Sequence, residues 1–339
     1  FRLGWNFNNE YFLSVENRKK LWDKQLVLHR LALPYSLSTY DFTGSYYTFQ
    51  VKSLTHDVQY KLKYPINEVS SVKTTLYYRN DRYVIKAQDD FTLPIKHFYD
   101  NWAGIKSEYV FDNTRPRGLN LFNGWRMKFF GEYYRQVNID SITKRHDLVV
   151  LGGDIRHYLK VHRSLVWANR LAGSTSFGTD RLCYYLGGID NWIVAKFNTD
   201  QEIKHSEKYA FQAIATNMRG FKQNARNGNN FVVWNSELRW PVFQYFANHP
   251  VSSDFFNNFQ IIGFTDVGMC WYGADPFSEE NTTNKWVKSY QNNTITIIIY
   301  EKKQPIIVGY GFGLRSRVFG YFMRVDFAWG YDNYTQQKR

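Results

Sequence analysis

The segment from 231 to 240 constrains the fold of this chain most strongly, because apolar and polar side chains alternate along it. One set is apolar apart from a single serine: Val232, Trp234, Ser236, Leu238 and Trp240. The other set is mostly polar: Val233, Asn235, Glu237 and Arg239. A period of two predicts a β-strand with one apolar and one polar face. Such a strand suits a soluble sandwich, with the polar face in water, and equally a membrane barrel, with the polar face in the lumen.

The same alternation recurs along much of the chain. It is found at 101–112, 125–135, 148–159, 259–271, 306–315 and 323–330. The first three of these segments carry charged residues along one face, which a dry sandwich core cannot accept unpaired. No run of about 18 apolar residues is present, so we expect no transmembrane helix. The pattern therefore predicts an all-β chain whose charged faces meet bulk water or a wet lumen.

Aromatic residues make up 19% of the 339 residues, while the formal net charge is +13 and the mean hydropathy is −0.50. This combination suits strands that are apolar on one side only, with aromatic girdles at the rims of a barrel. It also suits a secreted glycan-binding β protein. The positive charge indicates acidic surroundings such as lipopolysaccharide. Because the basic residues are scattered and no nucleic-acid motif accompanies them, we expect no nucleic-acid partner.

Enzymatic and metal-binding functions are not indicated by the sequence. The two cysteines, Cys183 and Cys270, have no metal-ligand spacing, and there is no Gly-x-Ser-x-Gly motif. The histidines at 146, 157 and 162 follow neither a metal nor a catalytic-triad pattern. We therefore expect no catalytic residue, no metal and no cofactor.

A short loop precedes the strand at 231–240 and contains Met218, Arg219, Gly220 and Phe221. Together with the strand that follows, it resembles the sixth-loop signature of the outer-membrane assembly factor superfamily, which includes barrels of the BamA/TamA and two-partner-secretion types. Met218 departs from the β-branched residue of that signature. In the superfamily this loop folds into the lumen, and its arginine meets an acidic residue of the inner wall. The alternative is a surface turn in which Arg219 is solvated and Gly220 supplies a positive φ.

A second match lies in the segment 259–271. Phe264, Asp266 and Gly268 form Phe-x-Asp-x-Gly on one face of the expected strand. In the superfamily this strand carries the acidic partner of the loop arginine, so the resemblance implies that Arg219 pairs with Asp266. Glu237, on the inner face of the intervening strand, is a second candidate partner.

A third match is the row Gly309, Gly311 and Gly313, which alternates with apolar residues on the other face. Glycines on one face leave room at the inner wall, where a folded-in loop can lie. No helix pattern follows these glycines, which argues against a nucleotide-binding loop. The segment resembles a penultimate strand of the same superfamily.

The resemblance implies an all-β chain, a single transmembrane antiparallel β-barrel domain over residues 1–339. It implies about 16 strands with an inward-folded loop, placed in the bacterial outer membrane. The expected function is insertion and assembly of outer-membrane proteins through a lateral seam between the first and last strands. The expected partners are outer-membrane lipid or lipopolysaccharide, unfolded outer-membrane protein clients, and accessory lipoproteins or periplasmic subunits. The alternatives are a polypeptide export pore, a membrane anchor for an amino-terminal domain, and a secreted glycan-binding β protein.

Both ends of the sequence lead to further expectations. Phe1 is not an initiator methionine and no signal peptide precedes it, so we expect a mature or partial chain that lacks any amino-terminal periplasmic domain. The superfamily ends in a further strand with a terminal aromatic residue. Residues 336–339 are polar, so we expect either that the last strand is missing from this chain or that the barrel closes differently.

Overall fold

A computed structural model of the chain describes residues 10–19, 21–40, 46–85, 98–137, 146–190, 194–199, 201–247, 251–290 and 295–332. Within these ranges, the side chains at 33–40, 46–51, 85, 98, 285–290 and 295–299 are not described. The expectation of a missing strand at 336–339 lies outside the described residues. None of the helices in the described ranges is long and apolar enough to cross a membrane.

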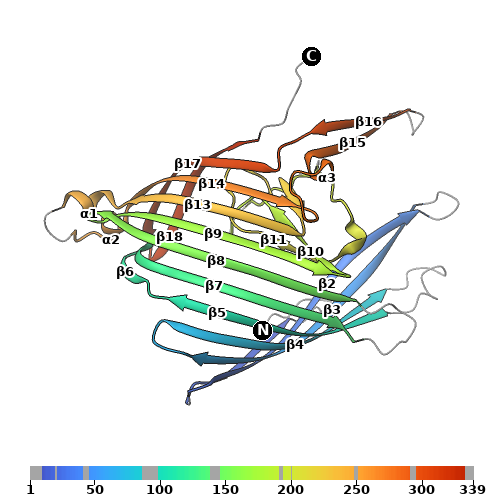
Figure 1. Cartoon of the computed structure of the whole chain (residues 1–339), viewed down its shortest axis with the longest axis horizontal. Helices are drawn as coiled ribbons and strands as arrows, with labels where there is room; N and C mark the ends of the chain where they lie inside the picture. Colours follow the sequence, from blue (N-terminus) through green and yellow to red (C-terminus); the bar gives the residue numbers. More distant parts are fainter. Residues whose placement is uncertain are drawn as a thin grey trace. The chain divides into compact units, whose positions relative to one another are not determined.

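Strands dominate the described residues, as the alternation predicts (Figure 1). They are β1 (Tyr11–Asn17), β2 (Asp23–Tyr40), β3 (Tyr46–Pro65), β4 (Ser70–Ile85), β5 (Phe98–Asp112), β6 (Arg115–Gly118), β7 (Leu121–Gln136), β8 (Asp147–His162), β9 (Leu165–Gly178), β10 (Arg181–Leu186), β11 (Tyr209–Ile214), β12 (Arg226–Gly228), β13 (Asn230–Trp240), β14 (Gln260–Trp271), β15 (Thr283–Tyr290), β16 (Ile295–Lys302), β17 (Ile306–Val318) and β18 (Tyr321–Tyr331). The helices are short: α1 (Val242–Phe246), α2 (Asp254–Asn258), α3 (Glu279–Thr282) and a 3-10 turn, η1 (Ser206–Lys208).

The largest sheet has 13 strands in the order β1-β2-β3-β4-β5-β7-β8-β9-β13-β14-β17-β18, with β6 paired to β7. This confirms the prediction of an all-β chain built on a large antiparallel sheet. Among the described residues, two smaller sheets are not hydrogen-bonded to it: β11-β10-β12 and β15-β16. In the small sheet of three strands, β10 and β11 run parallel, which the sequence did not indicate.

The chain divides into two compact units, and the first comprises residues 1–109 and 130–149. Here β2 and β3 form a long antiparallel hairpin, from Asp23 opposite Lys63 to Tyr40 opposite Tyr46. The charged face predicted for 101–112 is paired internally. Lys106 lies 2.7 Å from Glu132, and Lys73 lies 3.3 Å from Glu108. Neighbouring strands therefore neutralise one another's charges on this face.

The second unit comprises residues 110–129 and 150–339. Its strands β9, β13, β14, β17 and β18 pair in that order, all antiparallel. One row of this sheet places Asn235 opposite Asp266 and Asp266 opposite Gly309. Burial alternates along β14 as the sequence predicts, with Phe264 and Asp266 buried and Thr265 between them less so.

The two faces of this sheet differ in character. On the face that we call the apolar face, large side chains of β9, β13, β17 and β18 are exposed: Trp167, Leu171, Trp234, Leu238, Tyr310, Phe312, Phe327 and Trp329. Aromatic rings also pair across strands there, since the rings of Phe312 and Phe327 lie 5.0 Å apart. The opposite face, which we call the covered face, carries Glu237 and Asp266 and is buried under the segment 213–229.

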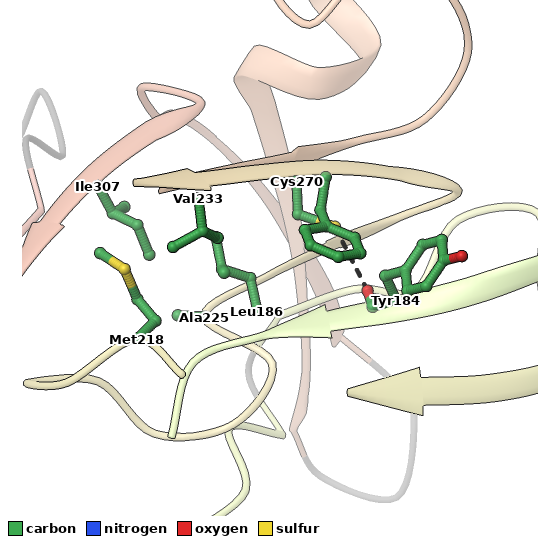
Figure 2. Packing of buried hydrophobic residues seen from close by; sticks show 8 residues of the cluster. Tyr184, Leu186, Met218, Ala225, Val233, Cys270 and Ile307 are labelled. Carbon is green, nitrogen blue, oxygen red and sulfur yellow. Dashed lines mark hydrogen bonds between the residues drawn. The ribbon is translucent and has the colours of Figure 1, made fainter. Parts of the chain in front are cut away.

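An apolar cluster holds that segment against the covered face (Figure 2). Met218, from the segment, and Val233 and Ile307, from β13 and β17, are all fully buried in it. Leu186, at the end of β10, is buried in the same cluster. The Cys270 thiol donates to the carbonyl oxygen of Tyr184 at 3.4 Å. The cluster thus provides a dry support beside the loop that carries Arg219.

Candidate functional site

The turn that presents Arg219 is built by glycines and backbone hydrogen bonds. Gly187 and Gly188 have φ values of 119° and 79°, and Gly220 has a φ of 87°. These left-handed conformations strain a residue that has a side chain. The amide of Met218 donates to the carbonyl of Gly188 at 2.9 Å, and the amide of Gly188 donates to that of Phe221 at 3.0 Å. Gly188 is therefore joined by its backbone to both ends of the loop motif, Met218 and Phe221.

Arg219 leaves this turn and points into the covered face, where it meets Asp266. Its Nε donates to Asp266 Oδ2 at 2.7 Å and its Nη2 to Oδ1 at 2.7 Å, a bidentate pair. The backbone amide of Arg219 also donates to Oδ2, at 3.1 Å. The Asp266 side chain has no exposed surface, and Arg219 is 6% exposed. The guanidinium is 3.7 Å from the centre of the Phe264 ring, a cation–π contact.

Glu237 joins three arginines at the same place. Nη1 of Arg219 donates to Glu237 Oε1 at 2.6 Å. Arg239 donates from Nε to Oε2 at 2.9 Å, and Arg315 donates from Nη2 to Oε1 at 3.0 Å. Asn235 completes the group by donating to Asp266 Oδ1 at 2.8 Å and to the carbonyl of Asn217 at 3.0 Å. We call these six residues the Arg219 cluster: Arg219, Asn235, Glu237, Arg239, Asp266 and Arg315.

Electrostatics favour the ionised form of Arg219 in this setting. Burial acts to lower the pKa of Arg219, but its hydrogen bonds to Asp266 and the charges of Asp266 and Glu237 outweigh burial, so the pKa is raised above its usual value. Desolvation cancels much of the attraction in a buried ion pair. The cluster therefore fixes the position of the loop more than it adds to the net stability of the fold.

The three glycines of β17 have different neighbours. A β-carbon at Gly309 would overlap the carbonyl oxygen of Arg219, so this glycine lets the loop approach the strand. Gly311 instead gives room to the carbonyl oxygen of Phe327 and the ring of Phe264, and Gly313 gives room to the side chain of Asp326. Of these three glycines, Gly309 is the one that the loop approaches.

The remaining motif residues lie around the same turn. Met218 is fully buried, and its Sδ would be 3.3 Å from a β-carbon at Gly268. A β-carbon at Gly220 would lie 2.5 Å from the carbonyl oxygen of Trp329, and the Phe221 ring lies against Gly330. The loop thus touches β14, β17 and β18 with successive residues.

The structure brings together all of the motif residues except Gly311 and Gly313, which lie beside the site. It also adds three residues for which the sequence analysis had expected no role: Asn235, Arg239 and Arg315. Alternation had placed Asn235 and Arg239 on the face of Glu237, which was the available signal. Among the described residues, no group of three or more His, Cys, Asp or Glu side chains could hold a metal ion.

The structure of this chain is similar to solved structures of other proteins. No protein-family model matches the sequence, and no curated protein matches it. A crystal structure of BamA from Haemophilus ducreyi lacking POTRA domains 1–3 is similar at a TM-score of 0.48 and 11% identity, covering 97% of this chain and 67% of that one. CdiB from Acinetobacter baumannii is similar at 0.46 and 12%, covering 95% of this chain and 50% of that one.

This chain spans half the length of the CdiB chain. The function is therefore inferred from the contacts of Arg219.

We predict that Asp266→Asn destabilises the second unit by roughly 3–5 kcal/mol, because it leaves a buried guanidinium without its bidentate partner. Urea unfolding of the purified chain, followed by tryptophan fluorescence, measures the change. Asp112→Asn is the matched control, since its carboxylate pairs with the half-exposed Arg126 at 2.8 Å. That control should cost less than about 1 kcal/mol. Equal effects of the two substitutions would contradict the prediction.

We also predict that Gly309→Ala displaces the loop and costs roughly 1–3 kcal/mol, because the new methyl group overlaps the Arg219 carbonyl. Trypsin cleavage after the exposed Lys222 should become faster as the loop loosens. Gly263→Ala, on β14 in the same sheet, is the control because its β-carbon meets nothing within 4 Å. Unchanged cleavage in Gly309→Ala would show that the close approach is not needed.

Proposed function

We propose that this chain is the membrane-embedded β-sheet domain of an outer-membrane protein that inserts or assembles other outer-membrane proteins. The observation that carries the proposal is the buried pairing of Arg219 with Asp266 and Glu237, which fixes a polar loop on one face of an antiparallel sheet. The superfamily resembled by these motifs uses this arrangement. The pairing joins the two motifs that the sequence alone had connected only by resemblance.

The apolar face of the second unit supports a lipid environment. Strands β13, β17 and β18 expose Trp234, Tyr310, Phe312 and Trp329 there, each at 42% or more of its surface. Large apolar groups exposed in such number on a soluble protein would be an interaction site or an aggregation hazard. A barrel wall places such a face against acyl chains while the polar face meets the lumen.

The edge of β18 supports a role in assembly. Within the described part of the chain, β18 pairs only with β17, so its second edge offers backbone amide and carbonyl groups. A free edge can accept an incoming strand by β-augmentation. This reaction needs no covalent step, and we propose that the chain is not an enzyme.

The loop supports that edge from the covered face. Gly220 and Phe221 lie against Trp329 and Gly330 of β18. Arg219 anchors the same turn to β14 and, through Glu237, to β13. We propose that the loop keeps β18 in register while its free edge is engaged by a client strand. Lipid and unfolded outer-membrane proteins are the partners that follow from this role.

We predict that Leu238→Arg destabilises the chain in lipid vesicles by roughly 2–4 kcal/mol, because it places a charge on the lipid-facing side of β13. Urea unfolding in vesicles of phosphatidylcholine provides the measurement. Leu238→Phe keeps an apolar group at the same position and should cost far less. A chain that remains monomeric in water without detergent and tolerates Leu238→Arg would count against the membrane assignment.

We predict that vesicles containing the chain accelerate the folding of a urea-unfolded outer-membrane protein over empty vesicles. Acquisition of protease resistance by the client is the readout. Arg219→Ala should lower the rate toward that of empty vesicles, because the loop loses its anchor. Arg126→Ala, which removes an arginine outside the cluster, should retain the wild-type rate. Circular dichroism confirms first that each variant is folded.

The same assay distinguishes the alternatives. A client that crosses into the vesicle lumen without inserting indicates polypeptide export rather than assembly. No acceleration by a folded wild-type chain rejects the assembly proposal.

A further inference from the structure

A cavity of about 200 Å³ lies beside the Arg219 cluster, entirely within the second unit. It is bounded by the covered face and by Ile189 and Asn217 of the loop, with Asn120 at the turn before β7. Arginines dominate its lining: Arg156, Arg170, Arg219, Arg239, Arg315 and Arg324. Glu237 is the one acidic residue that lines it among the described residues.

The charges around the cavity do not cancel. Its six arginines pair with four carboxylates, which are Asp154, Glu237, Asp266 and Asp326. Six guanidinium groups against four carboxylates leave two positive charges in excess. Because the cavity is small and walled by protein, solvent screens this excess less than it would on an open surface. The site therefore has the charge to hold a dianion.

The arginines divide into a buried set and an open set. Arg219, Arg239 and Arg315 are 12% exposed or less and share Glu237. Arg156, Arg170 and Arg324 are between 27% and 35% exposed. The buried set forms a fixed floor, whereas the open set can reach a ligand in the cavity.

The open set has guanidinium N–H groups that are not used in its ion pairs. Arg156 and Arg170 both bind Asp154, so one carboxylate serves two guanidinium groups. Arg170 uses Nε and Nη2 for Asp154, and Arg324 uses Nη2 for the carbonyl of Asp190. Within the described part of the chain, Nη1 of Arg170 and of Arg324 makes no hydrogen bond.

We propose that this cavity binds a phosphate-class oxyanion, either free phosphate or the phosphate of a lipid headgroup, through Arg156, Arg170 and Arg324. Planar guanidinium groups donate paired hydrogen bonds that match the oxygen geometry of a phosphate. A phosphate monoester carries about −1.5 to −2 charges at neutral pH, which matches the excess at the site. The proposal is independent of the role in assembly, because it rests on the charges of the cavity and not on the free edge of β18.

Occupancy would connect elements that are separate along the chain. Arg156 lies on β8, Arg170 on β9 and Arg324 on β18, while Arg324 also binds the loop at Asp190. A bound oxyanion would therefore hold the loop and β18 to the strands at the far side of the same cavity.

Isothermal titration calorimetry of the full chain in nonionic detergent tests the site, with inorganic phosphate as the probe. We expect saturable binding at one site per chain. Arg170→Gln should weaken it by about tenfold or more, because it removes a charged donor of paired hydrogen bonds. Asp154 keeps Arg156 as a partner in this variant. Arg126→Gln is the matched control, because it removes the same charge from the same unit outside the cavity, and its affinity should equal that of the wild type.

Arg324→Gln provides a second variant in case Arg170→Gln fails to fold, and it should weaken binding by a similar factor. A parallel titration with phosphatidic acid in mixed micelles separates the two sources. Tighter binding of phosphatidic acid assigns a lipid headgroup, and tighter binding of inorganic phosphate assigns the free ion. The proposal is overturned if neither probe binds, if Arg170→Gln and Arg324→Gln bind as the wild type does, or if hexaglutamate binds while both phosphate probes fail.

Discussion

One buried guanidinium organises the second unit. Arg219 enters the sheet face from a loop, and its bidentate pair with Asp266 and its bond to Glu237 leave it a single arrangement. An ion pair without exposed surface gains little net stability, yet displacing either partner leaves an uncompensated charge in a dry place. The interaction is therefore a constraint on where the loop lies, and the position of the loop decides what the neighbouring strands can do.

That constraint is satisfied only because the backbone leaves space for it. Gly309 lets the Arg219 carbonyl approach β17, and Gly220 lets the turn approach β18. The apolar cluster around Met218 and Leu186 holds the same turn from its other side. Polar pairing, close backbone approach and apolar packing thus act on one short segment. The loop is fixed beside the strand whose second edge pairs with no other strand of the described chain.

The two faces of the sheet differ in polarity and in charge. Large apolar side chains are exposed on one face, while the other gathers arginines around Glu237 and around a small cavity. The arginines outnumber their carboxylates there, so the covered face is basic even after internal pairing. Lipid on one side and an oxyanion on the other are the surroundings that this division suits.

Alternation along the chain by itself determined that the fold is all-β and which residues share a face, because side chains of a strand point to opposite sides in turn. The motifs also pointed to Arg219, Asp266 and Glu237. Only the tertiary structure decided that Arg315 joins Glu237, 78 positions away, and that Gly309 alone of its row receives the loop. It likewise decided the parallel pairing of β10 with β11. A period of two fixes the face of a residue but not its neighbours, which depend on strand order and register.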